Sequence, residues 1–270
     1  MTRDCPVSEY CFHSVPSFFP RRDELSGGVT VNSFLQKTPV LMCLTTVNLE
    51  ELKNALPHEE LHKKAEEMLT QKEVNILKSF SYSKRRMEWL GGRIAVKQAA
   101  LILLERVKSE NMTSLSVHSK ENGAPELVHN ITGVKNLSIS ISHSGNFAVG
   151  MATFAANCGV DIQKISEKTL KVVTKFAEPD EIKRLEQALP ECGTIKQLSL
   201  LWSAKEAYKK ALLADQPAIF QGVRLESIRV DHLIHLDLQT DGKNKNTAEI
   251  TAAILGDYVI AFTTRTNNDA

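Results

Sequence analysis

Residues 147–165 read FAVGMATFAANCGVDIQKI, and this stretch decides the fold class. The apolar run from Phe147 to Phe154 is typical of a buried strand, and residues 158–165 have the pattern of a second strand. Helical patterns follow at about 167–189 and 194–213, with Pro179 as a potential break in the first. Strands and helices therefore mix along the chain, which predicts an α+β (α/β) fold.

The same mixture of elements extends in both directions from this stretch. Apolar patterns predict strands at residues 40–47, 115–118, 137–141, 228–231, 234–238, 248–255 and 258–264. Helical spacing appears at 59–80 and at 84–108. A turn signal, Glu-Asn-Gly-Ala-Pro, occupies 121–125. The order of elements suggests two halves of similar plan, although the sequence contains no repeat that we could align.

Domain boundaries follow from this order. Residues 1–37 contain prolines and the pair Gly27-Gly28 without clear periodicity, so we expect an irregular N-terminal extension. Residues 38–150 would form the first subdomain and residues 151–265 the second.

Composition narrows the classes of function. The chain of 270 residues has 33 Lys plus Arg against 32 Asp plus Glu, so nothing indicates a general nucleic-acid or membrane surface. The five cysteines are scattered without zinc-ligand or redox-pair spacing, which indicates thiols in a reducing compartment. The first twenty residues lack the apolar run of a secretory signal. We therefore expect a cytoplasmic protein.

A group of charged side chains carries the candidate chemistry. Asp161 and Gln163 lie two residues apart on an expected strand and should share one face. Glu206 and Lys210 lie one helical turn apart on an expected helix. Carboxylate oxygens suit Mg²⁺, and lysines such as Lys205 and Lys210 suit phosphate oxygens. The residues alone allow another interpretation, in which Glu206 and Lys210 form an ordinary surface pair and Asp161 ends a strand.

Four motifs in this order resemble those of the surfactin-synthetase-type 4'-phosphopantetheinyl transferases. They are Gly-Val-Asp-Ile-Gln at 159–163, Trp-Ser-Ala-Lys-Glu-Ala-Tyr-Lys-Lys at 202–210, Ile-Ser-His-Ser-Gly at 141–145, and the basic stretch at 84–93 that ends in Gly-Gly-Arg. Each motif alone is weak, but their common order and spacing are specific. The resemblance covers roughly residues 40–265.

The resemblance implies transfer of 4'-phosphopantetheine from coenzyme A to a serine of an apo acyl or peptidyl carrier protein, with release of adenosine 3',5'-bisphosphate. It implies a monomeric pseudo-dimer of two similar subdomains, each with a small antiparallel sheet packed against helices. The active site would lie in the cleft between them, with Mg²⁺ on the pyrophosphate of coenzyme A.

The resemblance also suggests roles for single residues. Asp161 and Glu206 would bind Mg²⁺, with Gln163 as an uncertain third ligand. Glu206 could also act as the general base, and Lys210 could stabilise developing charge and bind a phosphate. Further contacts to coenzyme A are expected from Arg86, Arg93, Ser142, His143 and Lys205.

Structural interpretations stay open for some of these residues. His143 could be a hydrogen-bonded loop histidine, and the arginines could lie on a solvated helix face. A Ser-His catalytic triad is disfavoured because adjacent strand residues point apart and no nucleophile elbow is present.

Two positions depart from the family pattern. Gln163 stands where an acidic residue is usual, and Ala124 stands where many relatives have lysine, which Lys120 could replace. These departures leave open a non-catalytic homologue that only binds coenzyme A or a carrier protein. A different Mg²⁺-dependent phosphotransferase is a weaker alternative, since no Gly-rich phosphate loop is present.

Overall fold

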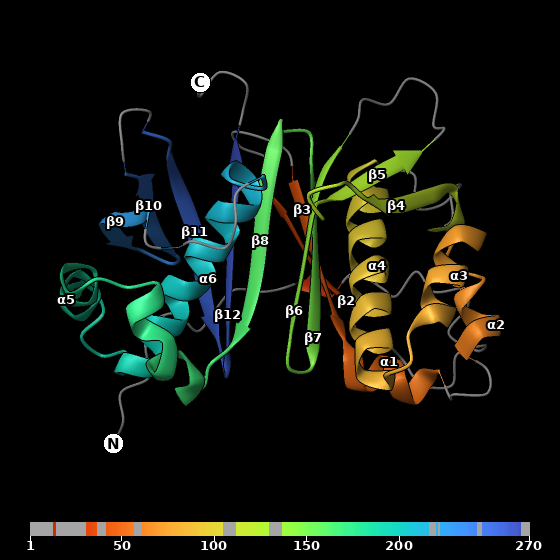
Figure 1. Cartoon of the computed structure of the whole chain (residues 1–270), viewed down its shortest axis with the longest axis horizontal. Coiled ribbons are helices and arrows are strands. Elements are labelled where there is room, and N and C mark those ends of the chain that lie inside the picture. The colour runs from red at the N-terminus through yellow and green to blue at the C-terminus, as the bar shows by residue number, and fades with distance from the viewer. Residues whose placement is uncertain are drawn as a thin grey trace. The chain divides into compact units, whose positions relative to one another are not determined.

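A computed structural model of the chain describes residues 13–14, 31–36, 42–56, 61–104, 112–129, 137–215, 220, 222–241 and 245–265 (Figure 1). The chain divides into two compact units, and their boundary falls between Asn157 and Cys158. Among the described residues, the N-terminal unit extends to Asn157 and the C-terminal unit is Cys158–Arg265. Each unit contains helices and a five-stranded sheet, so the expected mixed fold with two sheet-containing halves is confirmed.

The N-terminal unit is organised around one sheet and one long helix. Its sheet has the strand order β1-β2-β3-β7-β6, and β4 and β5 form a separate hairpin. The strands are β1 (His13–Ser14), β2 (Val31–Gln36), β3 (Met42–Asn48), β4 (Leu115–Ser119), β5 (Pro125–His129), β6 (Ser138–Ser144) and β7 (Phe147–Thr153). The helices are α1 (Leu49–Ala55), α2 (Leu61–Ala65), α3 (Gln71–Ser79), α4 (Ser83–Leu103) and the short 3₁₀ helix η1 (Met112–Ser114).

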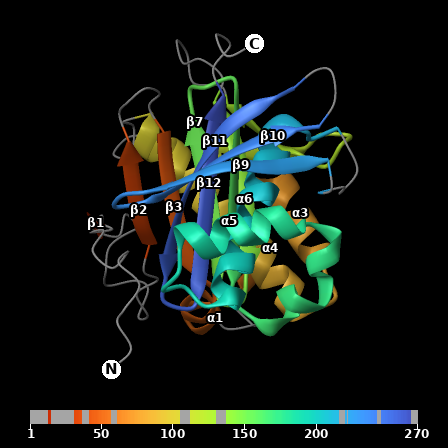
Figure 2. The same ribbon diagram turned by 90° about the vertical axis from the view of Figure 1, so that its left-hand side faces the viewer.

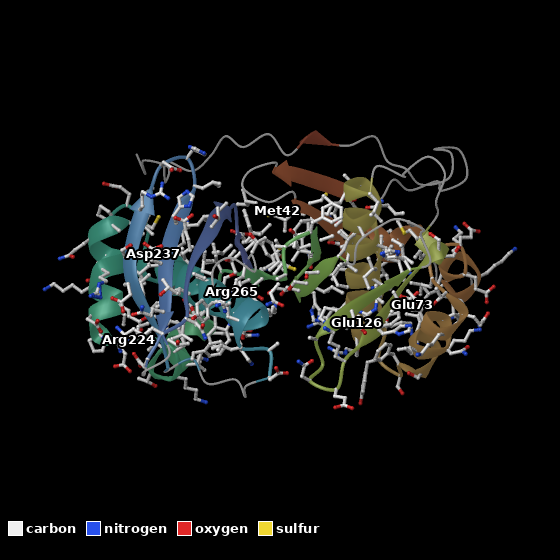
Figure 3. The ribbon with its side chains drawn as sticks, turned by 90° about the horizontal axis from the view of Figure 1, so that it is seen from above. Met42, Glu73, Glu126, Arg224, Asp237 and Arg265 are labelled. Atoms are coloured by element: carbon white, nitrogen blue, oxygen red, sulfur yellow. The ribbon has the colours of Figure 1, made fainter. Side chains whose placement is uncertain are left out.

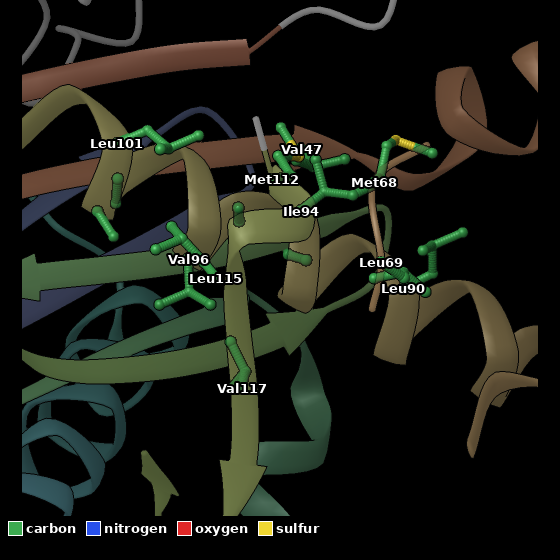
Figure 4. Packing of buried hydrophobic residues seen from close by; sticks show 14 of the residues in the cluster. Val47, Met68, Leu69, Leu90, Ile94, Val96, Leu101, Met112, Leu115 and Val117 are labelled. Atoms are coloured by element: carbon green, nitrogen blue, oxygen red, sulfur yellow. The ribbon is translucent and has the colours of Figure 1, made fainter. Parts of the chain in front are cut away.

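Helix α4 supplies much of the core of this unit. It packs mainly against β7 and β3, and its buried Leu90, Ile94 and Val96 lie in one apolar cluster with Leu115 and Val117 of β4 (Figure 4). Gly150 of β7 permits the close packing, because a Cβ there would meet the backbone nitrogen of Val96 at 2.2 Å. Burial of these side chains is the main force that holds helix and sheet together.

The C-terminal unit has the strand order β8-β12-β11-β10-β9. Its strands are β8 (Asn157–Lys164), β9 (Val223–Val230), β10 (Ile234–Thr240), β11 (Thr247–Leu255) and β12 (Tyr258–Arg265). Its helices are the 3₁₀ helix η2 (Glu167–Lys175), α5 (Pro179–Ala188) and α6 (Thr194–Leu212). Helix α6 packs mainly on β12 and also on β11, and α5 packs on β9 (Figure 2).

One set of buried contacts occurs in both units with the same spacing. Lys97 donates to Glu73 and to the carbonyl oxygen of Met68, at sequence separations of 24 and 29 residues. Figure 3 labels Glu73 among the side chains of the N-terminal unit. Lys205 donates to Glu181 and to the carbonyl oxygen of Phe176 at the same separations.

The same glutamates also complete each set. They accept the backbone N–H of Val117 in the first unit and of Leu225 in the second, 44 residues away in both cases. Every member of the second set lies 108 positions after its counterpart. The two units therefore share one internal scaffold, which the sequence comparison of the halves did not reveal.

Two expected helices divide for identifiable reasons. The 59–80 stretch forms α2 and α3, because Thr70 begins α3 with a capping box in which Thr70 and Glu73 satisfy each other's backbone N–H groups. The 167–189 stretch divides into η2 and α5, because Pro179 at the first turn of α5 cannot continue a preceding helix.

Three further expectations need correction. Residues 31–36, expected to be irregular, form strand β2 and pair with β3. Strand β5 was not expected, because it is short and begins at Pro125. Strand β5 forms because it pairs with β4 in an antiparallel ladder, which its own residue pattern does not predict. The unit boundary also lies at 157/158 and not at 150/151, because residues 147–153 are paired with β3 and β6 of the first unit.

Candidate active site

Asp161 lies in the middle of strand β8, within a buried segment. Val160 and Ile162 are fully or almost fully buried, and Asp161 itself is only 6% exposed. A carboxylate at such a position needs a charged or hydrogen-bonding partner. The structure provides one from helix α6.

Lys210 of α6 is this partner. Its Nζ donates to Oδ1 of Asp161 at 2.9 Å and to the carbonyl oxygen of Val160 at 2.9 Å. The Lys210 side chain is 27% exposed and that of Asp161 is 8% exposed. The ion pair therefore lies at the edge of the core and not on an open surface.

Glu206 lies one helical turn before Lys210 and completes the group. Burial raises the pKa of Glu206 above its usual value, and the negative charge of Asp161 raises it further. Lys210 and Lys209 act in the opposite direction. Because the two carboxylates influence each other electrostatically, they belong to one site.

Gly159 explains how strand and helix come so close. A Cβ on Gly159 would lie 1.9 Å from the carbonyl oxygen of Ala207 and 2.9 Å from the nitrogen of Ala211. Only a residue without a side chain allows this approach. Asp161 lies two residues further along β8, so the same close packing brings it beside α6.

Gln163 and Lys205 have other contacts in this structure. Gln163 is partly exposed, and its side-chain amide donates to the carbonyl oxygen of Lys164 at 3.0 Å. Lys205 is 1% exposed, and its ammonium lies 2.6 Å from the carbonyl oxygen of Phe176 and 2.8 Å from Oε1 of Glu181. The buried Lys205 therefore holds Glu181 and η2, and the expected phosphate contact has no support in its geometry.

His143 and Ser142 lie on strand β6 of the N-terminal unit, before the tight turn at Gly145, whose φ is +57°. Nδ1 of His143 is 3.8 Å from Oε1 of Glu88 on α4. Gly92 permits this meeting, since a Cβ there would lie 2.8 Å from Cγ2 of Ile141. Helix α4 and strand β6 thus bring His143 and Glu88 together.

Arg86 and Arg93 also lie on α4, where Arg86 contacts a backbone carbonyl and Arg93 an aromatic ring. One terminal nitrogen of Arg86 donates to the carbonyl oxygen of Phe80 at 2.6 Å. The guanidinium of Arg93 lies 4.6 Å from the ring centroid of Trp89, in a cation–π arrangement. Burial lowers the pKa of Arg93, and the nearby Glu73 opposes this effect. The N-terminal unit therefore gathers Arg86, Arg93 and His143 on α4 and the strand against it.

The donor set of Asp161 and Glu206 fits a hard divalent cation. Mg²⁺ commonly uses one or two protein carboxylates and takes its other ligands from water and substrate phosphates. Within the described ranges, no group of three or more His, Cys, Asp or Glu side chains could hold a metal ion.

A family model described as the 4'-phosphopantetheinyl transferase superfamily matches residues 157–263. This range nearly coincides with the C-terminal unit and contains Asp161, Glu206 and Lys210. The holo-[acyl-carrier-protein] synthase of Streptococcus agalactiae serotype III (strain NEM316) is 36% identical over 85 residues, which are 31% of this chain and 71% of the relative. The chain belongs to the 4'-phosphopantetheinyl transferase superfamily.

Other members of the superfamily give similar matches. The holo-[acyl-carrier-protein] synthase of Petrotoga mobilis (strain DSM 10674 / SJ95) is 31% identical over 98 residues, which are 33% of this chain and 81% of the relative. A solved holo-(acyl-carrier-protein) synthase from Bacillus anthracis, in complex with CoA (3',5'-ADP), is 27% identical. The match covers 41% of this chain and 90% of the synthase chain. Its TM-score is 0.34.

The superfamily match leaves Arg86, Arg93, Ser142 and His143 outside its range, so their roles stay predictions. Sequence reasoning missed two residues that the structure brings to these groups: Glu88 beside His143 and Glu181 beside Lys205. Glu88 carries no signal of its own in the sequence. Glu181 could have been found from the 108-residue spacing, which pairs it with Glu73. In the part of the chain that the structure describes, no helix is long and apolar enough to cross a membrane.

Proposed function

We propose that this protein transfers 4'-phosphopantetheine from coenzyme A to a serine hydroxyl of an apo acyl or peptidyl carrier protein and releases adenosine 3',5'-bisphosphate. The observation that carries the proposal is the group of Asp161, Glu206 and Lys210, which lies within the segment matched by the superfamily. Its relatives are named holo-[acyl-carrier-protein] synthases.

Asp161 and Glu206 would hold Mg²⁺ by their carboxylates. When bound, the ion neutralises charge on the pyrophosphate under attack and on its leaving group. Two carboxylates that repel each other in a buried place favour a divalent cation between them. Gln163 would be a third ligand through its Oε1, since its bond to the carbonyl oxygen of Lys164 uses only Nε2.

Glu206 would act as the general base. The serine oxygen of the carrier protein forms a bond to the phosphorus next to the pantetheine arm, and the bond from that phosphorus to the bridging oxygen breaks. The serine proton moves to Glu206, directly or through water, and adenosine 3',5'-bisphosphate leaves. A carboxylate with a raised pKa accepts a proton more readily than an ordinary glutamate does.

Cationic side chains would bind the phosphates of coenzyme A. Lys210 would bind the pyrophosphate, and Arg86, Arg93 and His143, with Ser142 beside them, would bind further phosphate oxygens. A guanidinium held by a backbone carbonyl, as in Arg86, or over an aromatic ring, as in Arg93, is preorganised for such a contact.

The test mixes the protein with coenzyme A, Mg²⁺ and a panel of apo acyl and peptidyl carrier proteins, and then weighs the carriers by intact-protein mass spectrometry. We expect one phosphopantetheine adduct on at least one carrier and none when Mg²⁺ is chelated. Binding of coenzyme A or a carrier protein without any adduct across the panel would support a non-catalytic homologue. It would contradict the proposed transferase activity.

A further inference from the structure

Lys210 contacts Asp161, one of the two carboxylates that would hold a metal ion. Its two contacts, to Oδ1 of Asp161 and to the carbonyl oxygen of Val160, are both 2.9 Å long. The ammonium therefore already supplies positive charge to an oxygen that a cation would use. A lysine in this geometry satisfies a buried carboxylate in the same way as a bound ion does.

The charges of the site also indicate that Lys210 acts as a counter-ion. Asp161 and Glu206 bring two carboxylates to this site, and the Lys210 ammonium lies 2.9 Å from Oδ1 of Asp161. Without a counter-ion, two carboxylates in this half-buried place would repel each other at neutral pH. Lys210 thus compensates for the second negative charge.

Comparison with the N-terminal unit shows that the charges belong together. At the spacing of 108 residues that relates the two units, Glu206 corresponds to Gln98 and Lys210 corresponds to Ile102. Gln98 is buried, and Ile102 packs against the apolar core. The unit that carries the extra carboxylate also carries the extra lysine, one helical turn away.

We propose that Lys210 is the built-in counter-ion of Asp161 and that it competes with a divalent cation for this carboxylate. The inference rests on the proposed function only in taking Asp161 and Glu206 as the metal ligands. Loading of the site would then release the Lys210 ammonium from Asp161 and leave it available to a phosphate of the substrate. One lysine would stabilise the site before loading and bind the substrate after it.

The experiment measures the affinity for Mn²⁺, in the absence of coenzyme A, by electron paramagnetic resonance of the unbound ion. The variants are Lys210→Met and Lys210→Gln, and Lys209→Met is the matched control, because Lys209 also lowers the pKa of Glu206. We expect both Lys210 variants to bind Mn²⁺ about tenfold more tightly and to melt at a lower temperature without metal. Lys209→Met should change the affinity by less than about threefold.

Other results would overturn the proposal. Unchanged or weaker Mn²⁺ binding in both Lys210 variants would make Lys210 a support of the metal site and not its competitor. If Lys209→Met increased the affinity for Mn²⁺ equally, the effect would come from net charge and not from the contact of Lys210 with Asp161. Lys210→Arg keeps the cation and should bind Mn²⁺ as the unsubstituted protein does, which controls for disturbed packing.

The carrier-protein assay separates this inference from the proposed function. If the unsubstituted protein modifies carriers but the Lys210 variants bind Mn²⁺ no more tightly, only the counter-ion inference fails. If no carrier is modified but the Mn²⁺ titrations behave as expected, the counter-ion inference holds and the transferase proposal fails.

Discussion

The two units of this protein share a scaffold but differ in what one helix carries. In each unit a buried lysine joins a glutamate to a backbone carbonyl, and the glutamate begins a helix and accepts an N–H from a strand. Helix α4 then continues with Gln98 and Ile102, whereas α6 continues with Glu206 and Lys210. The comparison separates the residues that build the fold from the residues that do chemistry.

The difference also explains why one lysine of the Trp-x-x-Lys-Glu motif is structural. Lys205 matches Lys97 in position and contacts, and burial lowers the pKa of both, while their glutamate partners oppose this effect. Glu206, the next residue along the chain, has no acidic counterpart in the first unit. Adjacent residues of one motif therefore serve different purposes, because they lie on different faces of α6.

The largest effect should come from the residues that only the C-terminal unit has. We expect Asp161→Asn and Glu206→Gln to lower the rate of transfer to a carrier protein by about 10²–10⁴-fold, because each removes a metal ligand or the base. Gln98→Ala, at the position that corresponds to Glu206, should leave the rate unchanged. Transfer rates from mass spectrometry, with folding checked by circular dichroism, measure the difference. Full activity of either carboxylate variant would overturn the site assignment.

The next effect concerns the contacts that both units share. Lys97→Met and Lys205→Met should each lower the free energy of unfolding by about 3–5 kcal/mol, because each leaves a buried glutamate without its counter-ion. Urea unfolding followed by circular dichroism measures this loss. The exposed Lys168→Met serves as the control and should stay within about 0.5 kcal/mol of the unsubstituted protein.

Unchanged stability of Lys205→Met would contradict the shared structural role of Lys97 and Lys205. If Lys205→Met kept its stability but lost affinity for coenzyme A, then Lys205 would be a phosphate contact after all. Lys97→Met would still report the structural role in the first unit.

A smaller effect is expected from the glycines that let helices approach strands. Gly159→Ala and Gly150→Ala should each cost about 1–3 kcal/mol of stability, since each Cβ would collide with a helix backbone. Only Gly159→Ala should also weaken Mn²⁺ binding, because it moves β8 away from α6. Gly193→Ala, where a Cβ meets nothing within 4 Å, is the control. Loss of Mn²⁺ binding in Gly150→Ala would contradict a site confined to the C-terminal unit.

The effect that is smallest at neutral pH concerns one buried thiol in each unit, Cys43 on β3 and Cys158 on β8. Burial raises the pKa of both to about 12 from the ordinary 9.0. Between these values the unfolded chain has lost the protons that the folded chain keeps, so stability should fall as the pH rises from 9 toward 12. Cys43→Ala and Cys158→Ala should each reduce this fall in urea titrations.

Thiol labelling of the native protein gives a second measurement of the same pair. In a background in which the other three cysteines are replaced by serine, both thiols should react slowly at pH 8, because the thiolate is the reactive form. Labelling of either one as fast as in the unfolded chain would contradict its burial. A difference in rate between them would identify the unit that opens first.

Much of the fold and the central part of the site could be predicted from the sequence. Periodicity located most strands and the two long helices, because residues that share a face recur at intervals set by local geometry. Asp161, Glu206 and the lysines suggested a metal-and-phosphate chemistry, and the four motifs in their common order and spacing indicated the superfamily.

The tertiary structure alone decided which charges meet. Lys210 and Asp161 are 49 residues apart, and Lys205 and Glu181 are 24 residues apart. No local pattern distinguishes a lysine that faces a phosphate from one that neutralises a buried glutamate. That choice depends on how closely β8 and η2 pack against α6, which Gly159 and the buried core set. The sequence by itself determined the chemical groups, and packing determined their partners.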